Sequence, residues 1–74
     1  MNTEDKAKAA EDFLNMIKEF WTWKKLSDEE RTMFAERFER DTDLITGTYQ
    51  QRYNAYLAMY NMFLNGLGYF KHPW

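Results

Sequence analysis

The sequence predicts an all-α fold: a compact three-helix bundle over about residues 3–25, 28–41 and 43–65, in a single domain with an aromatic C-terminal tail. Apolar residues recur every three or four positions along the third segment, which is the spacing of one helix face. A serine followed three positions later by a glutamate marks the start of the second. Aromatic residues make up 19% of the 74 residues and cysteine is absent, so a domain of this size depends on a dense aromatic core.

The first helix is expected over residues 3–25. Asn2 or Thr3 can cap it, and the two acidic residues that follow lie in the first turn, where the helix dipole favours negative charge. Trp23 lies about 60° to the side of Phe20, where it either covers the core or faces a partner. The predicted core stripe consists of Ala7, Ala10, Phe13, Leu14, Ile17, Phe20 and Trp21.

The second helix is expected to begin at Asp28. Ser27 and Glu30 have the spacing of a capping box, in which each side chain accepts a hydrogen bond from the other residue's backbone N–H. Phe34 and Phe38 would hold the helix on the core, and most other positions are charged. An acidic face is predicted here that selects basic partner surfaces. Its residues are Asp28, Glu29, Glu36, Glu39 and Asp43.

Two starting points fit the third helix. Its apolar stripe already holds at Ile45, which favours a start at Asp43 or the next residue. Gly47 would then lie inside the helix, at a cost of about 1 kcal/mol relative to alanine. The alternative places a turn at residues 46–48 and begins the helix at Tyr49. We favour the earlier start, with a kink at Gly47.

The third helix is apolar over roughly 200° of its circumference, whereas a surface helix needs a stripe of ~100°. The core positions predicted on this helix are Ile45, Tyr49, Tyr56, Tyr60 and Phe63. Its polar side carries only amides, which are Gln50, Gln51, Asn54, Asn61 and Asn65. A bundle with so thin a second helix cannot cover the whole arc, so the excess predicts an interface. The candidate partner-binding residues are Trp21, Trp23, Tyr53, Met59, Met62 and Trp74.

Arg52 is a further candidate, because it falls inside the apolar arc and a buried charge there needs a partner. It either pairs with an acid of the first or second helix, extends its charged end to solvent, or anchors a carboxylate of another chain. The C-terminal end of the helix is expected at Asn65, with Gly66 in the left-handed conformation and Leu67 as the hydrophobic contact. The tail 69–74 holds three aromatics and is expected to dock on the bundle or on another chain.

Composition argues against several functional classes. A net charge of −2 is not the basic footprint of a nucleic-acid-binding domain. The lone serine is used as a cap and the only histidine, His72, lies in the tail, so we expect no catalytic residues, no cofactor and no metal site. The N-terminus lacks a secretory pattern, which predicts a cytoplasmic protein. Asparagines and glycines interrupt the uncharged stretch 53–70, so no membrane span is expected.

These observations predict a non-enzymatic protein–protein interaction module, a small regulator or inhibitor that acts on a larger protein by steric occlusion, alone or as a homodimer. A short, acidic, cysteine-free helical chain has the size and composition of small regulators and inhibitors, including those that phages encode against host systems. The alternative is a helix-turn-helix-like nucleic-acid-binding regulator, in which amides of the third helix read bases. Arg52 is the only base on that helix, which leaves little affinity for phosphates.

Overall fold

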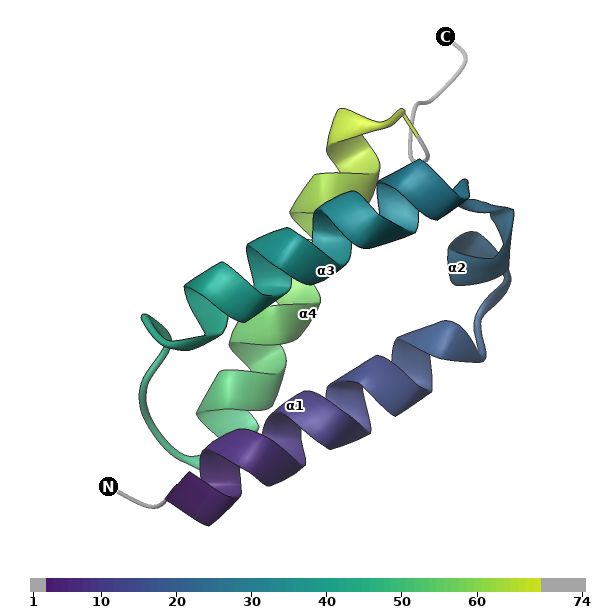
Figure 1. Ribbon diagram of the computed structural model, residues 1–74. Coiled ribbons are helices and arrows are strands. Elements are labelled where there is room, and N and C mark those ends of the chain that lie inside the picture. Colours follow the sequence, from purple (N-terminus) through teal and green to yellow (C-terminus); the bar gives the residue numbers. More distant parts are fainter. Residues whose placement is uncertain (1–2, 69–74) are drawn as a thin grey trace, which may run out of the picture.

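The computed structural model describes residues 3–68, and four α-helices lie in that range (Figure 1). Their bounds are α1 (Thr3–Lys18), α2 (Trp21–Lys25), α3 (Asp28–Thr42) and α4 (Tyr49–Gly66). The predicted all-α class is confirmed, but the first predicted helix is divided in two, so four helices take the place of three. The predicted aromatic tail, with Trp74, lies outside the described residues, as does Asn2.

The break between α1 and α2 lies at Glu19 and Phe20. The N–H groups of these residues donate to carbonyl groups three positions earlier, at 3.2 and 3.1 Å, which tightens the last turn of α1. Phe20 then adopts an extended conformation with φ −85° and ψ 151°. As a result Phe20 and Trp21 are 53% and 59% exposed, so their prediction as core residues is wrong.

Because the chain turns at this point, side chains other than the predicted Phe20 and Trp21 face the core. Thr22 and Leu26 are buried, and the Thr22 hydroxyl lies 3.3 Å from the Tyr60 hydroxyl. Trp23 packs edge-on against Phe34, with ring centroids 6.1 Å apart. The break is therefore stabilised by α2 side chains that cover one end of the core.

The core is an aromatic cluster centred on Phe13 of α1. The Phe13 ring lies 5.6 Å from that of Phe38 and 5.8 Å from that of Tyr56, which join α1 to α3 and to α4. α4 packs against both α1 and α3 and is the central helix, as its wide apolar arc predicts (Figure 1). Ala7 is exposed, and Ala9 is buried instead. The core consists of Ala9, Phe13, Ile17, Leu26, Phe34, Phe38, Tyr56, Tyr60, Phe63 and Leu64.

Both capping boxes at the helix starts are formed. Glu30 N–H donates to Ser27 Oγ at 3.1 Å and Ser27 N–H donates to Glu30 Oε1 at 2.9 Å, so the predicted start of α3 is confirmed. A second box begins α4, where Gln51 N–H donates to Thr48 Oγ1 at 3.2 Å and Thr48 N–H donates to Gln51 Oε1 at 2.9 Å. These bonds satisfy helix-start N–H groups that have no partner inside the helix.

The favoured start of the third helix at Asp43 is wrong, and the alternative start at Tyr49 is the one observed. Gly47 has a φ of 122°, a conformation outside the helical region that glycine adopts at little cost. The turn at Gly47 separates Ile45 from the helix, although Ile45 still packs against the core. The C-terminal end also differs from the prediction, because Gly66 closes α4 and Gly68, with φ 87°, is the left-handed residue.

Replacing Gly47 tests the turn before α4. A Cβ at this position would collide with Gln51 Oε1 and would force a positive φ on an L-residue. We expect Gly47→Ala to lower the free energy of unfolding by about 1–3 kcal/mol, measured by urea denaturation. The control is Gly66→Ala, since a Cβ there has no neighbour within 4 Å and alanine favours the helix. Equal free energies of unfolding for wild type and Gly47→Ala would contradict this account.

The contact between Tyr49 and Asp12 predicts a pH dependence. The Tyr49 hydroxyl donates to Asp12 Oδ2 at 2.6 Å, which raises the pKa of Tyr49 from 10.0 to about 12 and lowers that of Asp12. Between pH 10 and about pH 12 the unfolded chain loses the Tyr49 proton and the folded chain keeps it. The stabilisation that this hydrogen bond gives the folded state is therefore present below pH 10 and lost by about pH 12. We expect the stability difference between wild type and Tyr49→Phe to narrow over this range in urea denaturation. A constant difference would argue against the hydrogen bond.

Candidate protein-binding surface

The predicted partner-binding residues within 3–68 do not share one face. Tyr53 and Trp23 are partly buried at the edge of the core, where Tyr53 lies edge-on to Phe13 at 5.9 Å and Trp23 contacts the ring of Tyr60 at 6.3 Å. Trp21 is exposed at the end of the bundle where α1 and α2 meet. Arg52 is buried, and the two methionines, Met59 and Met62, lie elsewhere, beside α3.

A groove of about 570 Å³ between α3 and α4 contains both methionines, and we call it the methionine groove. Met62 is 73% exposed, while Met59 is partly buried against the core. Five of the lining residues belong to α4, at positions i, i+3, i+4, i+7 and i+8, which places them along one side of that helix. The lining residues are Arg37, Arg40, Asp41, Ala55, Ala58, Met59, Met62 and Phe63.

α3 supplies a basic rim to this groove. The Arg37 guanidinium lies over the Phe63 ring, 5.7 Å from its centroid, a geometry that favours the cation. Arg40 Nε donates to Asp41 Oδ1 at 2.9 Å, and this hydrogen bond lowers the pKa of Asp41. Within residues 3–68 Arg37 forms no ion pair. The rim therefore carries Arg40, which binds Asp41 directly, and Arg37, which acts on Asp41 at longer range and forms no ion pair within residues 3–68.

The predicted acidic face is divided among several hollows on α3, and Glu36 shares one of them with Arg37 and Arg40. All five of its residues are exposed. Asp28, Glu29 and Glu36 border a shallow hollow around Met33 at the N-terminal part of the helix. Glu39 and Asp43 border a groove that faces α1, whereas Arg37 and Arg40 border the methionine groove together with Asp41.

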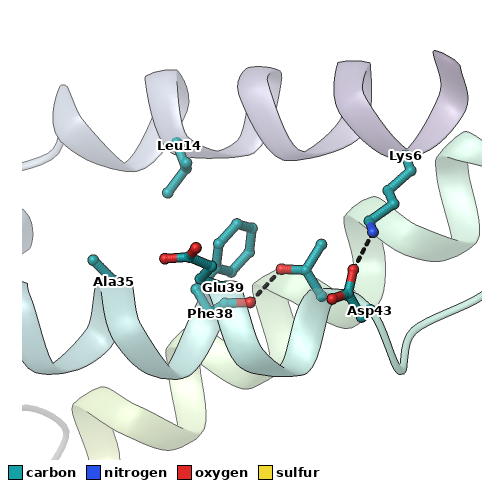
Figure 2. A pocket seen from close by; sticks show the side chains of 7 residues that line it. Lys6, Leu14, Ala35, Phe38, Glu39 and Asp43 are labelled. Carbon is teal, nitrogen blue, oxygen red and sulfur yellow. Dashed lines mark hydrogen bonds and ion pairs between the residues drawn. The ribbon is translucent and has the colours of Figure 1, made fainter. Parts of the chain in front are cut away.

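The groove between α1 and α3 has a volume of about 540 Å³ (Figure 2). Figure 2 shows Leu14 directed from α1 toward the Phe38 ring on α3, and Lys6 paired with Asp43 at one end. The Thr42 hydroxyl donates to the Phe38 carbonyl within the same helix. These polar groups of the groove already bind one another, which leaves them few open contacts for a ligand. The lining residues are Lys6, Leu14, Ala35, Phe38, Glu39, Thr42 and Asp43.

Arg52, predicted as an interface anchor, is instead buried, with 1% of its surface exposed. Its Nε donates to the Gly47 carbonyl at 2.9 Å and its Nη1 donates to the Ile45 carbonyl at 2.7 Å. Both carbonyls belong to the loop between α3 and α4, so the side chain ties this loop to the helix that follows. Arg52 therefore contributes to the fold and not to the candidate surface.

Sequence reasoning missed the other side of the methionine groove. The charge pattern of the second helix does not single out Arg37 or Arg40, and the predicted interface does not include Ala58. The sequence does contain the signal on α4, where two alanines and two methionines follow a helical spacing. Which side of α3 borders that stripe depends on how the two helices pack, which no local pattern contains.

Comparisons with protein-family models, with curated proteins and with solved structures find no match to this chain. Within residues 3–68, no helix combines the length and the apolar character that crossing a bilayer requires. The same residues contain no group of three or more side chains that could hold a metal ion.

The role of Arg52 can be tested by removing its charge. In Arg52→Met the carbonyls of Gly47 and Ile45 lose their donors inside the protein, and we expect the free energy of unfolding to fall by about 3 kcal/mol in urea denaturation. Arg40→Met is the matched control, because the Arg40 side chain is 70% exposed and its loss should change stability by at most about 0.5 kcal/mol. Similar losses for the two variants would contradict a structural role specific to Arg52.

Proposed function

We propose that this chain is a non-enzymatic cytoplasmic protein-binding module, a small regulator that inhibits a larger protein by covering part of its surface. The observation that carries the proposal is the methionine groove, in which Met62 is 73% exposed next to two alanines of the same helix. Exposed apolar surface of this kind is a marker of interaction sites. Methionine and arginine, which line the groove together, are both enriched at protein interfaces.

The groove has the properties of a binding surface and lacks those of a reaction centre. Methionine side chains are flexible and polarisable, so they adapt to the shape of an apolar partner. Asp41 is the only carboxylate among the lining residues, and Arg40 already binds it. A general base must be free to take a proton, and a nucleophile must have such a base beside it. The lining therefore supports binding through apolar contact.

Steric occlusion fits the size of the chain. A typical stable interface buries about 800 Å² on each partner, which is roughly a seventh of the 5397 Å² exposed here. Docking through the groove leaves the remainder of the bundle standing against the partner, where it excludes other molecules from the adjacent surface. Inhibition of this kind needs no conformational change and no chemistry in either protein.

The exposed side of α4 does not favour the helix-turn-helix alternative. The exposed side of α4 carries amides such as Asn54 and Asn61 and no charged residue, and the one arginine of this helix, Arg52, is buried. Reading bases requires phosphate contacts from nearby cations, because these supply most of the affinity. α4 therefore supplies no exposed cation of its own for phosphate contacts.

Affinity capture with the tagged chain and matched variants tests the proposal. We expect the tagged wild-type chain to recover a partner that Met62→Asp fails to recover. Docking would remove the new carboxylate from water at the centre of the apolar contact, and this desolvation weakens binding. Leu44→Asp is the control, since Leu44 is 79% exposed, lies outside the groove and receives the same charge change. The captured protein is then purified and its activity titrated with each variant. The proposal fails if no recovered protein depends on Met62, or if the wild-type chain leaves the activity of that protein unchanged.

A further inference from the structure

We infer that the methionine groove receives an amphipathic α-helix of another protein, with apolar side chains along α4 and carboxylates beside Arg37 and Arg40. This inference rests on the proposed function and specifies the partner. It is carried by the shape of the groove, by the charge of its rim, and by the lack of any carboxylate on α4 that could satisfy that rim in a second copy.

The shape of the groove fits a helix. Ala55, Ala58, Met59 and Met62 span eight residues of α4, a rise of about 10.5 Å or two helical turns. The alanines leave room for a close backbone approach, and both methionines follow them toward the C-terminal end of α4. An elongated groove between two helices is filled by a third helix, whose own side chains at positions i, i+3, i+4 and i+7 enter it.

The rim determines the charge of that helix. Arg37 and Arg40 are three residues apart on α3, so both point to the same flank of the groove. The arginine fork binds carboxylates with two parallel hydrogen bonds, and Arg37 has no ion pair within residues 3–68 that would have to be broken first. Its position over the Phe63 ring also orients the guanidinium before binding, which reduces the entropy lost in forming the contact.

A second copy of this chain is a poor occupant of the groove. A symmetric dimer would place the same surface on both sides, with two arginines and the Arg40-bound Asp41 on each, so a rim of net positive charge would meet another. α4 contains no aspartate or glutamate to offset them. The acidic part of α3 could reach the groove of a second copy only in a head-to-tail contact, which leaves one groove open and continues into a chain of molecules.

Two synthetic peptides test the inference directly. Both are helical, of equal length and with the same leucine stripe, and they differ only in one flank, which is glutamate in one and lysine in the other. Binding of each fluorescein-labelled peptide to the full chain is followed by fluorescence anisotropy. We expect the glutamate peptide to bind at least about tenfold more tightly than the lysine peptide, with a difference that shrinks as salt is added.

Three variants locate the contact. Arg37→Glu should abolish or reverse the preference for the glutamate peptide, and Met62→Asp should weaken both peptides at least tenfold. Leu44→Asp should leave both affinities unchanged. Equal affinity for the two peptides, or a preference that survives Arg37→Glu, would overturn the inference of an acidic helix. Urea denaturation of each variant shows whether a loss of binding arises from unfolding.

The result separates this inference from the proposed function. If neither peptide binds while Met62-dependent capture and inhibition of a partner persist, the inference is overturned and the proposed function stands. If no partner depends on Met62 in either experiment, both are overturned. Light scattering of the chain alone should give 9.1 kDa. A mass that rises with concentration, and does not in Met62→Asp, would assign the groove to a second copy and overturn the inference.

Discussion

The ring of Phe13 is the contact on which the rest of this small bundle depends. It touches aromatic rings of α3 and of α4, and Ala9 and Ile17, one turn away on either side, are buried with it. A chain of 74 residues without cysteine has no disulfide to offset the conformational entropy that is lost on folding. The apolar area that these rings bury offsets that loss instead. Once Phe13 sets which sides of α3 and α4 face inward, the surfaces left outside follow. The methionine side of α4 is one of them.

Local patterns in the sequence predict the elements that are stabilised locally. The capping box at Ser27 and the spacing of Phe34 and Phe38 lead to the correct start and buried face of α3. The capping sequence at Thr48 has the same form, and it competes with an apolar stripe that continues through Ile45. Ile45 continues the apolar stripe because it packs on the core from a loop, which is a tertiary contact. In the prediction the stripe outweighs the capping sequence at Thr48, and the helix start is therefore placed too early.

Features set by tertiary packing could not be predicted in the same way. The break at Glu19 and Phe20 has no glycine or proline to mark it, and it is stabilised by what α2 then buries, including Thr22. Arg52 has the spacing of an apolar residue because its guanidinium serves loop carbonyls inside the protein. The width of the apolar arc on α4 correctly indicated that Met62 is exposed, yet an arc does not tell which of its two edges another helix covers.

The net charge of α3 and the positions of its charged side chains lead to different expectations about a partner. Residues 28–42 carry six acids and three arginines, a sum of −3 that predicts attraction to basic partners. In the folded helix Asp28, Glu29 and Glu36 border a hollow around Met33 and Glu39 lies toward α1. Arg37 and Arg40 border the methionine groove together with Asp41, which Arg40 binds. A partner that docks there meets the local field of those arginines at contact distance, while the carboxylates on the far flank are screened by water and salt. In the proposed complex, selection at the groove follows Arg37 and Arg40, which favours an acidic partner helix although the chain as a whole is acidic.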